Sequence, residues 1–148
     1  MKATNVLCQY SCFFVSDRGN CFFNGGPSLV SSMWQTIDLS QYIDSYFIDN
    51  QIAKYNLSAW IGGYLDQDDC STVFLTFLNQ SGHAINSSIQ IGPVMAITSG
   101  YVPKLMFREA QGLVPIGTRF FNVEVIFSRL SGTMNNGDID NIAVTVYQ

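Results

Sequence analysis

The stretch that decides the fold is Phe121-Asn122-Val123-Glu124-Val125-Ile126-Phe127. Its odd-numbered residues are all apolar, whereas the even-numbered ones include Asn122 and Glu124. Successive side chains of a strand point to opposite faces, so this period of two predicts a strand with one buried face. The same alternation follows Lys54 and predicts an inward set and an outward set. The inward set is Tyr55, Leu57, Ala59 and Ile61, and the outward set is Lys54, Asn56, Ser58 and Trp60.

Further runs of β-branched and aromatic residues are bounded by Gly, Pro, Asn and Asp, which is typical of short strands between turns. These runs are 20–23, 32–39, 72–78, 84–91, 104–109 and 139–147. About eight strands without a long helix predict an all-β domain, and the layer rules favour a two-sheet jelly-roll β-sandwich. At most one short helix is expected, within Leu39–Asn50 after a Ser40 cap.

Composition and charge limit the classes of partner. The 148 residues fit one domain of ordinary size. The net charge is -4 and the seven Lys and Arg residues are scattered. Nucleic-acid binding needs clustered basic residues, so it is not expected. No apolar stretch approaches the ~20 residues that a membrane helix needs, so we expect no membrane insertion.

The cysteines bear on the compartment of the protein. They are Cys8, Cys12, Cys21 and Cys70, with no C-x-x-C pair. With His83 as the lone histidine, disulfides are favoured over a zinc site, although the sequence leaves the three possible pairings open. Disulfides imply an oxidising compartment.

Three glycosylation sequons begin at Asn56, Asn79 and Asn86. They agree with a secreted or cell-surface glycoprotein. The stretch from Met1 to Val15 lacks the pattern of a signal peptide. Either the chain is intracellular or its natural start lies upstream of Met1, and we favour the upstream start.

Catalytic patterns are scarce. The sequence contains no G-x-S-x-G, no glycine-rich phosphate loop and no H-E-x-x-H. A Ser–His–Asp triad would have to use His83, and the only two glutamates are Glu109 and Glu124. We therefore expect a protein that is not an enzyme.

A sugar-binding site needs an exposed aromatic ring that stacks on a pyranose, together with a few polar groups. Trp60 is the first candidate because it belongs to an outward set, although it equally fits a cover over a sheet edge. Trp34 is a second candidate, with packing under a loop as the alternative. Arg108 is a candidate hydrogen-bond donor to a ligand, and the alternative is a surface ion pair with Glu109 or with Asp residues.

Asp140 has the same parity as the apolar residues Ile142, Val144 and Val146 of the last strand. A strictly alternating strand would therefore turn this carboxylate inward, where it needs a partner. Two roles stay open: capping of loop N–H groups, or binding of one structural Ca²⁺, which prefers carboxylate and carbonyl oxygens.

Four segments, in this order, resemble galactose-binding-like β-sandwiches, the fold of many carbohydrate-binding modules. They are 17–23 (DRGNCFF), 32–39 (SMWQTIDL), 55–64 (YNLSAWIGGY) and 137–142 (GDIDNI). The resemblance implies a jelly roll over residues 17–148, often with one structural calcium held near Asn20 and Asp140. Residues 1–16 do not match the usual first strand of that family.

The resemblance implies a function in recognition. The first hypothesis is a non-catalytic carbohydrate-binding module of a secreted or surface protein, with a glycan as its partner. The alternative is a structural or adhesive domain that contacts cell-surface or extracellular proteins. A hydrolase acting on glycosides is a distant third.

Overall fold

The computed structural model describes residues 2–4, 7–10 and 21–148. The strands are β1 (Lys2–Thr4), β2 (Leu7–Tyr10), β3 (Cys21–Gly26), β4 (Val30–Asp38), β5 (Lys54–Gly63), β6 (Cys70–Leu78), β7 (Ile89–Ile91), β8 (Lys104–Leu113), β9 (Phe120–Ser128) and β10 (Asn135–Tyr147). The helices are the 3-10 turn η1 (Leu39–Gln41) and the α-helices α1 (Ser45–Asp49) and α2 (Ala96–Ser99).

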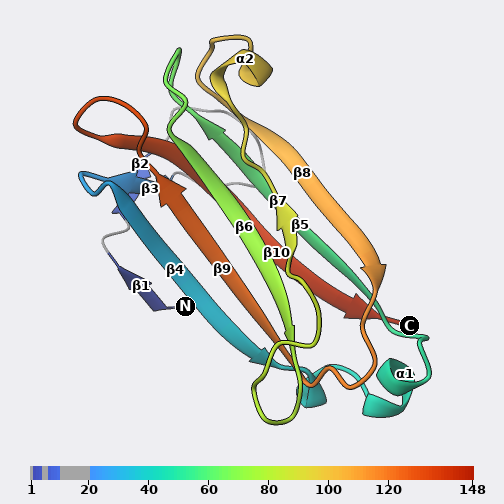
Figure 1. Ribbon diagram of the computed structural model, residues 1–148. Helices are drawn as coiled ribbons and strands as arrows, with labels where there is room; N and C mark the ends of the chain where they lie inside the picture. The colour runs from blue at the N-terminus through green and yellow to red at the C-terminus, as the bar shows by residue number, and fades with distance from the viewer. Residues whose placement is uncertain (1, 5–6, 11–20) are drawn as a thin grey trace.

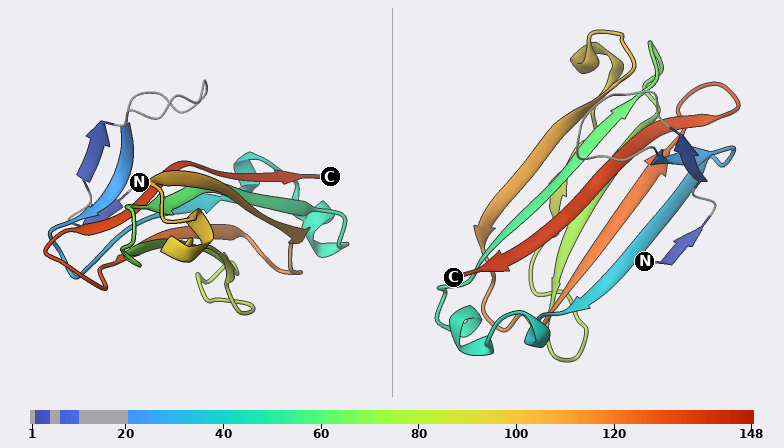
Figure 2. Two further views of the ribbon diagram at one scale, coloured as in Figure 1. Left: turned by 90° about the horizontal axis from the view of Figure 1, so that it is seen from above. Right: turned by 180° about the vertical axis from the view of Figure 1, so that it is seen from behind.

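The strands form two five-stranded sheets that pack face to face (Figures 1 and 2). Sheet A has the order β1-β4-β9-β6-β7, and sheet B has the order β2-β3-β10-β5-β8. Every pair of neighbouring strands is antiparallel. The predicted all-β, two-sheet sandwich is therefore confirmed. The N-terminal strands β1 and β2 extend one sheet each, β1 beside β4 and β2 beside β3.

The core lies between the inner faces of the two sheets. In β9, the inward residues Phe121, Val123, Val125 and Phe127 are at most 4% exposed. A chain of aromatic rings joins the sheets, because the ring of Phe77 lies 5.2 Å from that of Tyr55 in β5 and 5.6 Å from that of Phe121. The alternation predicted for β9 and β5 is confirmed. Each fully buried apolar side chain of this kind contributes roughly 1.5–3 kcal/mol.

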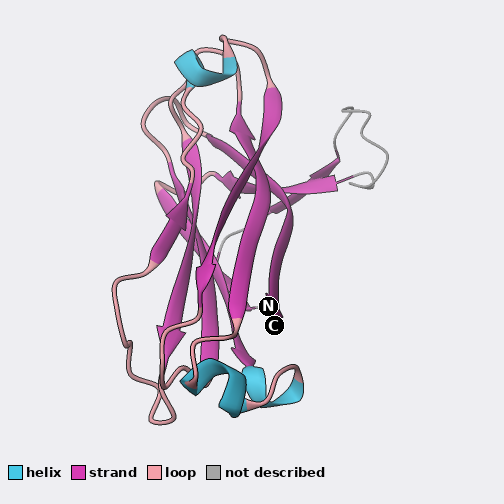
Figure 3. Cartoon of the chain, turned by 90° about the vertical axis from the view of Figure 1, so that its right-hand side faces the viewer, coloured by secondary structure: helices cyan, strands magenta, loops and turns pink. Residues whose placement is uncertain are grey.

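The helices lie at the two ends of the sandwich and leave the outer sheet faces uncovered (Figure 3). The segment after β4 holds a helix as predicted, but the N-cap residues of η1 and α1 are both aspartates. The Asp38 carboxylate accepts a hydrogen bond from Ser40 N at 3.0 Å, and the Asp44 carboxylate accepts one from Tyr46 N at 2.8 Å. Ser40 therefore lies inside η1 and does not cap a helix. Helix α2 is a second short helix beyond the one expected.

The last strand is interrupted by a β-bulge. The register between β10 and β5 shifts between Asp140 and Ala143, and Asn141 has a φ of 52°. Ile139 is 0% exposed, so inward residues before the bulge are odd-numbered. After the bulge the even-numbered Ile142, Val144 and Val146 pack against the core. A bulge inserts one extra residue and so reverses the parity of the strand.

None of the helices in the described ranges is both long enough and apolar enough to cross a lipid bilayer.

Candidate functional site

The outer face of sheet B carries Trp60, the first predicted ligand-binding residue. Alternate residues of β5 are fully buried, including Leu57, Ala59 and Ile61, so the residues between them point outward. Trp60 is one of these outward residues and is half-buried. Its side chain lies on the solvent side of the sheet, as the alternation predicted.

The ring of Trp60 pairs with that of Phe107. These residues lie opposite each other in β5 and β8, with ring centroids 5.6 Å apart and planes inclined by 60°. Phe107 is 46% exposed. On the other side of Trp60, in β10, the opposite residue is Asp140. The three strands run side by side in Figure 2, so Asp140, Trp60 and Phe107 form a row across the face, which we call the aromatic row.

Polar side chains border the aromatic row on one side. The next outward residues are Ser58 in β5 and Glu109 opposite it in β8, followed by Asn56 and Gln111. The Asn56 side-chain amide donates a hydrogen bond to Glu109 Oε2 at 3.3 Å. Hydroxyl, amide and carboxylate groups thus lie next to two aromatic rings.

The next row across the sheet, on the other side of the aromatic row, consists of Asp138, Gly62 and Leu105. Gly62 is the next outward position in β5, and a Cβ there would collide with the main-chain carbonyl of Lys104. The aromatic row thus places two inclined aromatic rings beside hydroxyl, amide and carboxylate groups on an outer sheet face.

The other two predicted ligand residues lie elsewhere. Trp34 is opposite Glu124 in sheet A and points away from the core, because its neighbour Met33 is 1% exposed. The two tryptophans are therefore on opposite faces of the sandwich. Arg108 is opposite the buried Ala59, and its guanidinium donates to the Phe107 carbonyl at 2.9 Å. The structure does not bring Trp34 or Arg108 to the aromatic row.

The inward orientation expected for Asp140 is wrong, because the bulge after it reverses the parity of β10. Its carboxylate accepts a hydrogen bond from Asn141 N at 2.8 Å, on the exposed side. In the part of the chain that is described, no three His, Cys, Asp or Glu side chains converge to hold a metal ion. Asn20, the other residue expected near calcium, lies outside the described residues. The calcium site stays a prediction.

A fully buried carboxylate lies elsewhere, at Asp69, which is 1% exposed. It accepts hydrogen bonds from the backbone N–H groups of Leu130 at 2.6 Å, Ser131 at 3.0 Å and Asn136 at 3.1 Å. Leu130 and Ser131 lie on the loop between β9 and β10, and Asn136 lies at the start of β10. The sequence showed Asp69 only as one member of the acidic run 66–69, and nothing local distinguished it from its neighbours.

The cysteines do not contribute to the aromatic row. Cys70 is a free thiol, so the prediction that all four cysteines pair is wrong at this position. Cys12 lies outside the described residues, as do the side chains of Cys8 and Cys21.

Of the three asparagines that begin glycosylation sequons, Asn86 is exposed, whereas Asn56 and Asn79 are half-buried. The Asn79 side chain accepts hydrogen bonds from Ser81 N and His83 N.

The sequence matches no protein-family model, and no curated protein matches it. Solved structures do share its fold. The enzymatically active domain of bacteriophage CBA120 tailspike protein 4 is similar over 99% of this chain, with a TM-score of 0.63 and 18% identity. This chain spans only 19% of that tailspike chain.

Two carbohydrate-binding modules are also similar. The family 16 carbohydrate-binding module-2 aligns with 86% of this chain and 77% of its own, at a TM-score of 0.53 and 16% identity. The C-terminal family 22 module of Clostridium thermocellum Xyn10B aligns with 97% of this chain and 82% of its own, at a TM-score of 0.53 and 13% identity. Such low identities establish the fold alone. The shared fold is a sandwich of two antiparallel sheets, the architecture that the sequence predicted.

Proposed function

We propose that this domain is a non-catalytic carbohydrate-binding module of a secreted or surface protein, and that Trp60 and Phe107 form its stacking surface. The observation that carries the proposal is the pair of rings, 5.6 Å apart, on an outer sheet face. Similar folds in two carbohydrate-binding modules support the ligand class.

The chemistry of a sugar fits the aromatic row. One face of a pyranose presents C–H groups that pack on an aromatic ring, while its hydroxyl groups point sideways and need partners. Asp140 and Glu109 have carboxylate oxygens that accept hydrogen bonds from hydroxyl groups, and such charge-assisted bonds are strong. Two carboxylates at one surface also disfavour acidic sugars by like-charge repulsion. The proposed ligand is therefore a neutral glycan.

Replacing Trp60 with alanine is expected to weaken glycan binding by about 2 kcal/mol, roughly thirty-fold in Kd, because a central aromatic anchor is lost. Phe107→Ala is expected to have a smaller effect in the same direction. The measurement is a glycan array with the folded domain, followed by titration calorimetry on the best neutral oligosaccharide found.

Trp34→Ala is the matched control, since it removes the same side chain from the outer face of sheet A. It is expected to leave the affinity unchanged. If the folded wild-type domain bound no glycan, or if both tryptophan variants bound equally well, the proposed site would be ruled out. Absence of any glycan binding would favour the adhesive alternative, in which the domain contacts extracellular proteins.

A further inference from the structure

A hollow lies at the end of the sandwich that carries α1, where Figure 1 shows η1, α1 and the start of β9. Its volume is about 670 Å³, within the range of ordinary ligand pockets. We call it the α1 cavity. Its walls come from three parts of the chain: residues 38–45 with Ile48, the turn residue Gln80, and Arg119 with Phe120.

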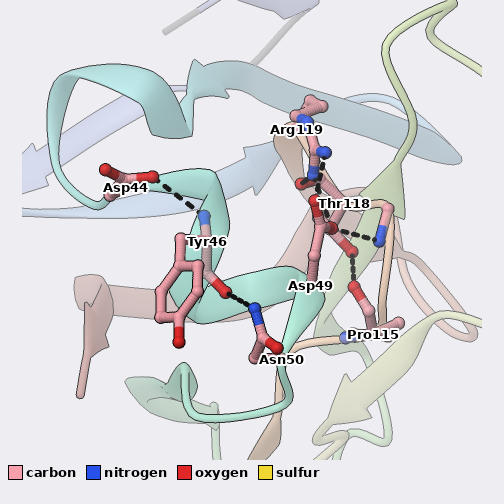
Figure 4. A network of polar contacts seen from close by, with 8 residues as sticks. Asp44, Tyr46, Asp49, Asn50, Pro115, Thr118 and Arg119 are labelled. Atoms are coloured by element: carbon pink, nitrogen blue, oxygen red, sulfur yellow. Dashed lines mark hydrogen bonds and ion pairs between the residues drawn. The ribbon is translucent and has the colours of Figure 1, made fainter.

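The walls of the α1 cavity are held in place by hydrogen bonds (Figure 4). Asp44 caps α1 through Tyr46 N, as described above. At the other end of α1, Asp49 forms an ion pair with Arg119 at 2.7 Å and accepts a hydrogen bond from Gly117 N at 3.1 Å. The Arg119 hydrogen bond lowers the pKa of Asp49, so this contact persists at neutral pH. A cavity fixed in this way loses little entropy on binding.

The lining combines an apolar floor with a polar rim. Leu39 and Ile48 are each 1% exposed and form part of the floor, whereas Tyr42 is 68% exposed at the rim. Asp38 and Asp44 use Oδ1 for their caps, which leaves Oδ2 of each to accept a further hydrogen bond. The Arg119 guanidinium is already engaged by Asp49. The cavity therefore offers acceptors and an aromatic ring but no unpaired cation.

The α1 cavity is separate from the aromatic row and shares two lining residues with another hollow. Trp60 lies six residues beyond Lys54, the first residue of β5, which is roughly 20 Å along the strand. A smaller groove of about 360 Å³ shares Leu39 and Tyr42 with the cavity and runs between β4 and the end of β10. Tyr42 stands where the two hollows meet.

We propose that the α1 cavity is a second saccharide-binding site, which takes a short stretch of neutral glycan with Tyr42 as its stacking residue. Its ligand class rests on the proposed function, but its geometry does not depend on the aromatic row. Two separate sites on one domain raise its affinity for a long polysaccharide over that for a short oligosaccharide, because the second contact is intramolecular.

The test is nuclear magnetic resonance titration of the full ¹⁵N-labelled chain with xylohexaose, cellohexaose and mannohexaose as separate probes. At least one probe is expected to shift the amide signals of Ser40, Asp44 and Gln80. Tyr42→Ala is expected to weaken that binding at least tenfold and to leave the Trp60 signals responsive. Gln80→Ala, a second exposed position on the rim, is expected to weaken it less.

Tyr46→Ala is the matched control, because Tyr46 is 61% exposed and does not line the cavity. It is expected to bind like the wild type. If the probes shift the Trp60 region alone, the second site is refuted and the proposed function stands. If they shift the cavity alone, the second site is supported and the aromatic row is refuted. If none of the three shifts either region, both proposals fail.

Discussion

Asp69→Ala is expected to lower the free energy of unfolding by about 3 kcal/mol or more. One buried carboxylate accepts hydrogen bonds from three backbone N–H groups, two on the loop after β9 and one at the start of β10. Hydrogen bonds to a charged acceptor are stronger than neutral ones, and a buried donor left without a partner costs about 1–3 kcal/mol. The measurement is urea unfolding at neutral pH, with the free energies compared at equal m-values.

Two variants make the result specific. Asp69→Asn keeps the shape and one acceptor oxygen but turns an NH₂ group toward N–H donors, so it should destabilise as well. Asp68→Ala removes an exposed neighbour that accepts a single hydrogen bond, from Ala96 N at 3.1 Å, and should cost about 1 kcal/mol. Equal effects of the Asp68 and Asp69 alanine variants would contradict the role given to Asp69.

The stability of the domain is expected to fall as the pH rises from about 4 to about 7, because of Asp138. Burial raises the pKa of its carboxyl to about 7, although the hydrogen bond from the Asn24 amide, at 2.7 Å, acts in the lowering direction. In the unfolded chain the pKa is about 3.9. Between these values the native state holds a proton that the unfolded state has lost.

The sign of the pH effect follows from this difference in bound protons. When the native state binds more protons than the unfolded state, stability decreases with rising pH, by at most about 1.4 kcal/mol per pH unit for one group. The contribution of Asp138 is complete below its unfolded pKa and is lost as the pH rises through its folded pKa. Asp49, whose pKa is lowered, acts in the opposite direction and only at more acidic pH.

Asp138→Asn isolates this effect, because the amide oxygen can still accept from Asn24 but does not titrate. We expect the free energy of unfolding of the variant to lose its dependence on pH between pH 5 and 7. At pH 8 we expect it to exceed that of the wild type, on the order of a few kcal/mol. Unfolding in urea at a series of pH values measures both. Parallel pH profiles for the wild type and the variant would show that Asp138 is ionised in the native protein.

Part of the candidate site was predictable from local patterns. The outward position of Trp60 followed from alternation in β5, and Leu57 and Ile61 are indeed fully buried. Phe107 was missed as its partner, because the pairing depends on the register between β5 and β8, which are more than forty residues apart. Placement of the two tryptophans on opposite faces likewise depends on which sheet each strand joins.

The sequence by itself determined the all-β sandwich and the buried faces of β5 and β9, because side-chain alternation is a local property of the extended chain. It did not indicate β1 or β2, and it predicted a strand over 84–91 where β7 covers only Ile89–Ile91. Only the tertiary structure decided that the carboxylates of Asp69 and Asp138 are buried and that the carboxylate of Asp140 is not. The bulge at Asn141 turned Asp140 outward, and loop closure turned Asp69 inward. One inserted residue reverses every following side chain, and three N–H donors some sixty residues away become neighbours only after folding.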